Sequence, residues 1–235
     1  TEPDAGTNTH RITTTAKPNG DGWLLSGTKY YTSGVDEADS ILVVARSGEA
    51  DASGRHQLSL FIVAADAPGI TCQDIPCVVQ AAEKQFTVFF DDVELGPEAL
   101  IGVEGNGLRQ VFAGLNPERI AAAAINNGIA RYGLETASQY AQDRVVWNNP
   151  IGAHQGVAHP LAAAYIGVQQ ARLMNARAAE LYDAGSEEAG EVANMAKFAA
   201  ADSSLVALDQ SIQTLGGNGL ALEYGLADLW FVARL

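Results

Sequence analysis

The chain of 235 residues is 47% hydrophobic and 18% charged, a composition typical of a soluble globular protein with one large or two modest domains. The formal net charge of −14 argues against a nucleic-acid surface, because phosphate backbones are bound by clustered Lys and Arg. The longest apolar run, Ile120–Ile125, is too short to cross a bilayer, and no basic-then-apolar leader pattern is present. We therefore expect a soluble, cytoplasmic protein without a membrane span.

A metal site is not expected. Cys72 and Cys77 are the only cysteines, too few for a disulfide framework or a cysteine zinc site. His154 and His159 are five residues apart, so they do not share one helix face.

The first part of the chain, residues 1–105, has the pattern of strands. Four short β-rich runs are present, at 23–25, 41–44, 58–63 and 86–90. Turn residues separate these runs, among them Asn19–Gly22 and Ala67–Gly69. No helical run lies between the strands, so we predict an antiparallel sandwich or barrel domain.

After Gly105-Asn106-Gly107 the pattern becomes helical. Leu108, Val111, Phe112 and Leu115 have helical spacing, and an alanine-rich helix continues to Tyr140. Further helices are predicted over about 154–181 and 187–214. The fold class is therefore α+β, with a helical bundle over residues 106–235 that follows the β domain. The chain ends inside a helical pattern at Trp230–Leu235 without a terminator, which indicates a truncated bundle.

Four separated segments carry a more specific signal. The first is Thr-Glu-Pro-Asp-Ala-Gly-Thr at 1–7, and the second is Gly-Thr-Lys-Tyr-Tyr-Thr-Ser-Gly at 27–34, followed by Ala38-Asp39. The third joins Arg144 to Pro150-Ile151 and Gln155, and the fourth is Gln-Thr-Leu-Gly-Gly-Asn-Gly at 213–219 with Glu223-Tyr224. In this order, they resemble the acyl-CoA dehydrogenase family.

The resemblance implies an FAD-dependent oxidoreductase of fatty acid metabolism that desaturates an acyl-CoA thioester. It implies an N-terminal helical domain, missing here, before a middle β domain and a C-terminal helical domain. It also implies a homodimer or homotetramer with FAD bound across a subunit interface, and an acceptor such as an electron-transfer flavoprotein.

In the β domain, the resemblance assigns Thr7, Tyr30 and Thr32 to the flavin. Thr32 matches the threonine whose hydroxyl hydrogen-bonds the reactive flavin nitrogen. Tyr30 falls at the tryptophan that covers one flavin face if the segment is one residue shorter here, and Tyr31 is the alternative. Thr7 replaces a serine near the flavin phosphates and keeps a hydroxyl. The other interpretations are alternating strand residues for the tyrosines and a local turn hydrogen bond for Thr7.

In the helical domain, the resemblance assigns Arg144, Trp147 and Gln155 to the FAD of a neighbouring subunit. The planar fork of an arginine suits a diphosphate. The resemblance also brings the segment with Gln213, Gly216 and Gly217 to the same cofactor, where glycines let backbone amides approach phosphate. A charge at a helix end and a plain helix terminator are the other interpretations.

The catalytic base has two candidate positions. In most of the family it is a glutamate beyond the Gly-Gly segment, after the last residue of this chain. In a minority it precedes an arginine on the first bundle helix, where Glu118 and Arg119 stand here after Pro117. The other interpretation is that Glu118 caps a first helical turn that begins at Pro117. Two further functions remain open, a flavin monooxygenase or nitroalkane-oxidase-like enzyme on the same fold and a non-catalytic relative.

Overall fold

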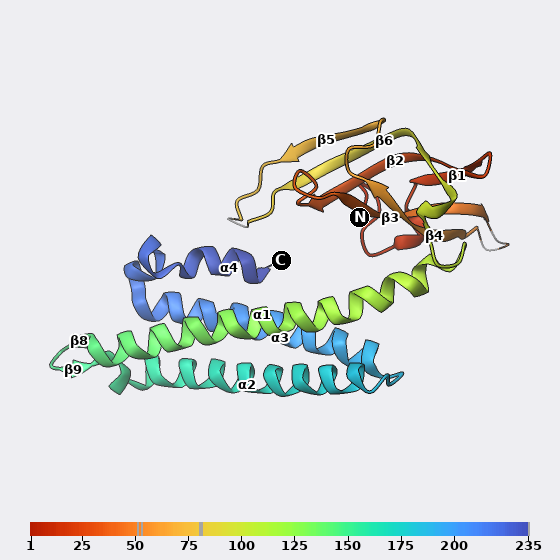
Figure 1. Cartoon of the computed structure of the whole chain (residues 1–235). Coiled ribbons are helices and arrows are strands. Elements are labelled where there is room, and N and C mark those ends of the chain that lie inside the picture. The colour runs from red at the N-terminus through yellow and green to blue at the C-terminus, as the bar shows by residue number, and fades with distance from the viewer. Residues whose placement is uncertain (51, 53, 80–81, 235) are drawn as a thin grey trace. The chain divides into compact units, whose positions relative to one another are not determined.

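The computed structural model describes residues 1–50, 52, 54–79 and 82–234. Contacts between residues divide the chain into two compact units, Thr1–Ala113 and Gly114–Leu235. The strands of the main sheet lie in the first unit, and the long helices, apart from the start of the first one at residues 107–113, make up the second (Figure 1). The predicted α+β class is confirmed. We propose the domain boundary at 105/106, because the first long helix begins at Gly107.

The β unit contains one seven-stranded sheet with the order β5-β6-β2-β1-β3-β4-β7. Its strands are β1 (Thr15–Asn19), β2 (Gly22–Ser33), β3 (Ser40–Ala50), β4 (His56–Ala64), β5 (Ile70–Ile75), β6 (Gln85–Leu95) and β7 (Leu100–Ile101). All neighbours pair antiparallel except β1 and β3, which meet in parallel where Thr15 pairs with Arg46. The four predicted β-rich runs lie in β2, β3, β4 and β6.

The core of the β unit comes mainly from alternate residues of β2 and β3 and from a continuous buried run in β4. Leu25 and Val43 are fully buried between more exposed neighbours, whereas residues 58–61 of β4 are all buried. The rings of Trp23 and Phe61 meet edge to face with centroids 5.3 Å apart. This core fixes which side chains of β2 point inward.

The helical unit is built from α1 (Gly107–Asp143), α2 (Gln155–Asp183), α3 (Ala189–Leu215) and α4 (Leu226–Arg234). A two-stranded hairpin of β8 (Val145–Val146) and β9 (Asn149–Pro150) connects α1 to α2, where the sequence suggested a simple helix break. The single-turn 3-10 helices of the chain are η1 (Thr9–Arg11), η2 (Pro97–Ala99), η3 (Ile151–Ala153), η4 (Gly216–Leu220) and η5 (Leu222–Tyr224). Among the described residues, no helix combines the length and the apolar composition needed to cross a membrane.

Alanines let the three long helices approach closely, as their abundance predicted. Ala123 of α1, Ala171 and Ala178 of α2, and Ala196 and Ala200 of α3 form one buried cluster. A larger cluster of Leu134, Val168, Leu208 and Leu226 joins all four helices toward the other end. The switch from strands to helices is fixed at Gly107, because a side chain there would lie 2.6 Å from the carbonyl oxygen of Leu58.

A buried polar contact connects α1 to α3 within this apolar packing. The Ser204 hydroxyl donates to Asn126 Oδ1 at 2.8 Å, and the Asn126 amide donates to the carbonyl of Ala122 at 3.1 Å. Ser204 is fully buried and Asn126 is 7% exposed. Removing one partner therefore leaves a polar atom without water or protein to replace it.

We predict that Ser204→Ala lowers the free energy of unfolding by about 1–3 kcal/mol, because Asn126 Oδ1 loses its donor. The matched control is Ser203→Ala, since the neighbouring hydroxyl bonds only carbonyls of its own helix, Ala199 and Ala200. Its effect is expected to stay within about 0.5 kcal/mol. Urea unfolding of both variants measures the difference, and equal losses would contradict the role of the interhelical bond.

Candidate cofactor site

The N-terminal segment of the β unit forms a tight turn against the sheet. Glu2 and Ala5 exchange backbone hydrogen bonds of 2.9 and 3.1 Å, which closes the turn. Ala5 and Ile12 are buried against Leu58 of β4. Thr7 follows the turn and is exposed, and its carbonyl accepts the N–H of Thr9 at 3.1 Å. The predicted phosphate-binding hydroxyl therefore stands on an anchored, accessible loop.

Glu2 is the anchor of this turn. Its carboxylate accepts hydrogen bonds from five donors, the backbone N–H and hydroxyl of Thr13, the same pair of Thr14, and Lys29 Nζ. The bond from Lys29 is 2.8 Å and that from the Thr14 hydroxyl is 2.6 Å. Glu2 is 4% exposed, Thr14 0% and Lys29 8%. This is a buried ion pair whose carboxylate has all its acceptor positions used.

The environment of the pair shifts both pKa values. Burial acts to raise the pKa of the Glu2 carboxyl, but the hydrogen bonds from Lys29, Thr14 and Thr13 outweigh it and lower the pKa to about 2. Burial lowers the pKa of the Lys29 ammonium, and the bond to Glu2 offsets only part of this effect. The carboxylate is thus held ionised far into the acid range.

Next to Lys29, strand β2 carries a β-bulge. Lys29 pairs with Val88 and Thr32 with Phe86, so Tyr30 and Tyr31 stand opposite the single residue Thr87. Tyr31 has a left-handed backbone with φ 55°, which is rare for a residue with a side chain.

The bulge brings the two tyrosines together. Their rings lie with centroids 4.4 Å apart, Tyr30 half-buried and Tyr31 53% exposed. Tyr30 also donates its N–H to the carbonyl of Thr1 at 3.0 Å. The two predicted flavin segments of the β unit are therefore in direct contact.

In the helical unit, the hairpin β8–β9 positions Arg144 and Trp147. Trp147 and Asn148 form its two-residue turn, and both have left-handed backbones with φ 51° and 64°. Trp147 is 83% exposed, and its ring meets that of His154 edge to face at 6.2 Å. An exposed tryptophan in a strained backbone costs on the order of 1 kcal/mol, which points to a binding role.

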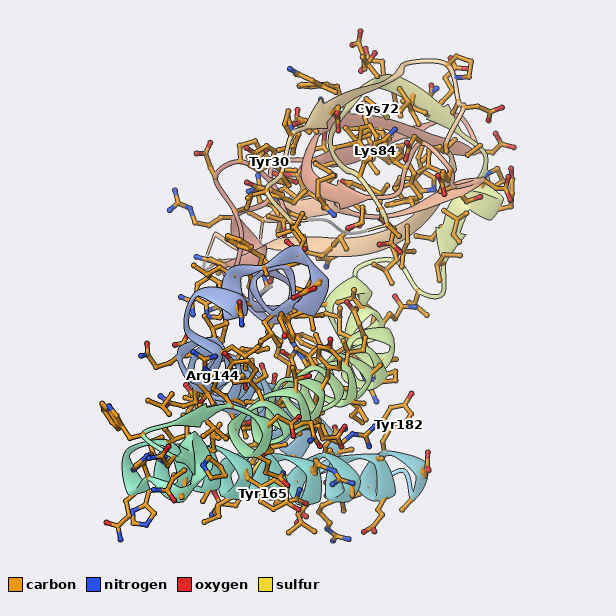
Figure 2. The ribbon with its side chains drawn as sticks, turned by 90° about the vertical axis from the view of Figure 1, so that its left-hand side faces the viewer. Tyr30, Cys72, Lys84, Arg144, Tyr165 and Tyr182 are labelled. Carbon is orange, nitrogen blue, oxygen red and sulfur yellow. The ribbon has the colours of Figure 1, made fainter. Side chains whose placement is uncertain are left out.

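Arg144 and Gln155 flank this hairpin. The carbonyl of Arg144 accepts the N–H of Ile151 at 2.8 Å, which closes the base of the loop, and Gln155 is the first residue of α2. Both side chains are exposed, and Figure 2 shows Arg144 on the helical unit.

The segment after α3 lies against the same end of α1. Gly216 ends α3 with φ 60° and ψ −132°, a conformation open to glycine, and its N–H donates to the carbonyl of Gln213. Asn218 donates to the Tyr140 hydroxyl at 3.2 Å, and the Tyr140 carbonyl accepts the N–H of Arg144 at 2.9 Å. Tyr140 thereby connects the two predicted cofactor segments of the helical unit, a role that sequence reasoning missed.

Glu118 and Arg119 lie on α1, away from a helix start. The helix begins at Gly107 and passes through Pro117, so the interpretation of Glu118 as a first-turn cap is wrong. Pro117 lacks the N–H that an interior position normally donates, but it follows ten helical residues and does not start the helix. Glu118 is exposed, and Arg119 is half-buried and donates to Asn116 Oδ1 at 3.1 Å.

A large cleft of the helical unit does not include these residues. It has a volume of about 1210 Å³ and lies between α1 and α2, and its lining includes the apolar side chains of Leu134 and Leu161 and the charged side chains of Arg131 and Arg172. None of the predicted cofactor residues lines it. Size alone therefore does not identify the cofactor site.

Comparison with known proteins assigns the two parts of the chain to one family. Residues 1–93 match the family model of the acyl-CoA dehydrogenase middle domain, and residues 105–235 match that of the acyl-CoA dehydrogenase C-terminal domain. The chain belongs to the acyl-CoA dehydrogenase family. It is 51% identical to acyl-CoA dehydrogenase FadE12 of Mycobacterium tuberculosis H37Rv, over all of this chain and 61% of that protein.

Solved structures of the acyl-CoA dehydrogenase family have the same fold. A glutaryl-coenzyme A dehydrogenase in complex with glutaryl-CoA superimposes with a TM-score of 0.92 at 33% identity, over 100% of this chain and 59% of that one. A glutaryl-CoA dehydrogenase from Mycobacterium smegmatis in complex with FADH2 gives a TM-score of 0.90 at 26% identity, with 100% and 58% covered. The chain thus spans about three fifths of the length of these relatives.

We predict that Glu2 makes the free energy of unfolding depend on pH in the acid range. Its pKa falls from 4.5 to about 2 on folding, so the stabilisation is complete above pH 4.5 and is lost as the pH falls toward 2. At pH 7, Glu2→Gln is expected to lose on the order of 2 kcal/mol, and the difference from the wild type shrinks as the pH falls.

Urea unfolding between pH 2.5 and pH 7 measures this difference. Glu180→Gln is the control, because the pair of Glu180 with Arg177 is exposed on one helix. A difference between Glu2→Gln and wild type that stays constant over the whole range would contradict the assignment.

Proposed function

We propose that the full-length protein is an FAD-dependent acyl-CoA dehydrogenase that forms a double bond between the α and β carbons of an acyl-CoA thioester. One observation carries the proposal: residues of the four family motifs form two accessible groups, each held by its own hydrogen bonds. Thr7, Tyr30, Tyr31 and Thr32 form the group in the β unit. Arg144, Trp147, Gln155, Gln213, Gly216 and Gly217 form the group in the helical unit.

The donor chemistry of the helical group fits the diphosphate end of FAD. The Arg144 guanidinium is exposed and suited to bidentate phosphate binding. The Gln155 and Gln213 side chains are exposed as well, and Tyr140 connects the segment of Arg144 to the segment after α3. A Cβ at Gly216 or Gly217 would meet no atom within 4 Å, so the backbone there is open to a ligand. The exposed face of Trp147 is suited to stacking on a planar ring.

The β group fits the ring end of the cofactor. Tyr30 and Tyr31 offer aromatic surface at the bulge, and Thr32 lies directly after them with a hydroxyl that can donate. When bound, FAD supplies the ring that accepts a hydride. The residues of this chain hold that ring, exclude water from it and orient the substrate.

We propose a homodimer or homotetramer in which the two groups that bind one FAD come from different subunits. The outer faces of α2 and α3 expose large apolar side chains, with Leu173 and Phe198 both 74% exposed. Exposed apolar side chains of this size on neighbouring helices are typical of surfaces that bind protein. A second copy of the full-length protein is the partner that this proposal requires. An electron-transfer flavoprotein is the proposed acceptor of the electrons.

Glu118 is the proposed base within this chain. Its carboxylate would accept the proton from the α carbon while the hydride leaves the β carbon, so that the C–H electrons at the α carbon form the new double bond. The Arg119 guanidinium donates a hydrogen bond to Asn116 Oδ1, and Arg119 is the residue directly after Glu118. A substrate bound over this part of α1 would also remove the exposed Glu118 from water, which favours transfer of the proton to its carboxylate.

A flavin absorption spectrum of the full-length protein, followed by a panel of acyl-CoA substrates under anaerobic conditions, tests the function. The wild type is expected to be yellow and to lose its flavin colour with an acyl-CoA. Glu118→Gln is expected to keep both ligands and to slow this loss about 10²–10⁴-fold, because the proton has no acceptor.

Glu223→Gln is the control, since that carboxylate lies in η5 after the glycine segment. Loss of colour at the wild-type rate in Glu118→Gln would move the base to another residue. A colourless wild type that takes up no FAD would overturn the proposed function.

We predict that Arg144→Ala weakens FAD binding by about 10-fold or more, because a charge-assisted hydrogen bond to phosphate is lost. Arg144→Lys should recover only part of the affinity, since an ammonium lacks the planar fork. Arg177→Ala on α2 is the control for loss of an exposed arginine. Titration of the apoprotein by flavin fluorescence measures all three, and an unchanged affinity in Arg144→Ala would contradict the assignment.

A further inference from the structure

The Glu2–Lys29 pair is a buried charged group that the proposed chemistry leaves unused. Both residues are nearly inaccessible, and neither is among the side chains proposed to touch the cofactor or the substrate. Lys29 comes from β2 and Glu2 from the turn at 1–5, so the pair joins two segments that are 27 residues apart in sequence. The pair therefore joins the N-terminal turn to the strand that carries the bulge.

Burial of an ion pair is an inefficient way to stabilise a fold. Each charge loses its hydration, and an apolar pair of the same volume is often equally stable or more stable. The Glu2 site nevertheless supplies five donors to a single carboxylate. Such a site fixes the position and the orientation of its members much more tightly than apolar contact does, because each hydrogen bond has a direction.

The residues fixed in this way are those beside the candidate cofactor contacts. Lys29 is the last residue of β2 in regular register before the bulge, and Thr32 is the first after it. The N–H of Tyr30 is bound to Thr1, the neighbour of Glu2. The bulge is therefore held on one side by the ion pair and on the other by the pairing of Thr32 with Phe86.

The strain at the bulge needs this restraint. Tyr31 adopts a left-handed backbone at φ 55°, a conformation that costs on the order of 1 kcal/mol without glycine. Without an inward anchor at position 29, the strand can relax by shifting the bulge along β2. A shift of one residue would send the side chains of this segment to the opposite face of the sheet.

We infer that Glu2 and Lys29 are positioning residues that hold the Tyr30–Thr32 bulge and the loop with Thr7 in the one arrangement that binds the flavin. This inference rests on the proposed function, because it concerns the same FAD. The pair acts through the segments that it joins and does not touch the cofactor. Its charges contribute to the geometry of the site more than to the stability of the fold.

The experiment uses the full-length protein with three variants, Glu2→Gln, Lys29→Met and the double variant Glu2→Gln/Lys29→Met. Each single variant leaves a buried partner uncompensated and is expected to lose stability and FAD affinity together. The double variant has no unpaired charge, so its urea midpoint should recover toward the wild-type value. Its FAD dissociation constant should remain raised at least tenfold.

Visible circular dichroism at saturating FAD provides the second measurement, because it reports the surroundings of the bound flavin ring. The double variant is expected to show an altered spectrum. Lys84→Met is the matched control, since Lys84 lies in the same unit (Figure 2) and forms an exposed ion pair with Asp36 at 3.1 Å. It should keep both the wild-type affinity and the wild-type spectrum.

The outcomes separate the possible roles. A double variant that recovers stability, affinity and spectrum together would show a merely structural pair and overturn the inference. A double variant that does not fold would do the same. Wild-type protein that takes up no FAD would overturn the proposed function itself. If the wild type binds FAD and the folded double variant binds it equally tightly, only the inference is overturned.

Discussion

The hydrogen bonds to the ionised carboxylate of Glu2 are the interaction on which the arrangement of the N-terminal turn and the bulge in β2 depends. A carboxylate that loses water without finding donors costs several kcal/mol, so the chain must bring donors to it or leave it exposed. Thr13, Thr14 and Lys29 meet this requirement from two separate segments. Satisfying one side chain therefore forces the N-terminal turn, the start of β1 and the middle of β2 into contact. The apolar contact of Ala5 and Ile12 with Leu58 then closes the rest of the segment onto the sheet.

In the helical unit, close helix packing and the side chain of Tyr140 hold the candidate cofactor segments in place. Alanines at the contacts of α1, α2 and α3 bring the helix axes near to each other, so the ends of the helices are fixed by rigid elements. At one such end, the Tyr140 carbonyl accepts the N–H of Arg144, the residue before the hairpin, and its hydroxyl accepts the amide of Asn218 in the segment after α3. Loops that carry function are often placed by such a scaffold and do not need internal order of their own.

Much of this arrangement could be predicted from the sequence. Alternating apolar residues located β2, β3, β4 and β6, and alanine-rich periodic runs located α1, α2 and α3, because these patterns express burial on one face. β5 escaped notice because most of its residues are exposed at the edge of the sheet, so no apolar alternation marks it. The sequence predicts only a break after α1, since the hairpin turn uses Trp147 and Asn148 in left-handed conformations without a glycine. Pro117 favours a helix start by its residue type, but the helical spacing from Leu108 onward predicts the longer helix that α1 forms.

For the candidate site, too, the sequence predicts some residues and not others. Residue types and spacing could place Thr7, Tyr30, Arg144 and Gln213 in motifs, because the motifs are local in sequence. They could not show that Lys29 points inward to Glu2, or that Tyr140 joins two loops, since these contacts cross 27 and 78 residues of chain. Contacts of that separation depend on the fold, and a single sequence has no local pattern that reports them.

The bulge in β2 also bears on how chain length is allowed to vary. Two residues of β2, Tyr30 and Tyr31, face the single residue Thr87 of β6, so β2 has one extra residue at this point. Gain or loss of one residue there changes the size of the bulge and leaves the pairing on both sides intact. An insertion or deletion within a regularly paired stretch of β2 would instead displace every later pair. Two related chains that differ by one residue in this segment can thus present equivalent side chains. Equivalent positions in β2 are therefore identified by the residues that they pair with on β6, and not by counting residues along β2.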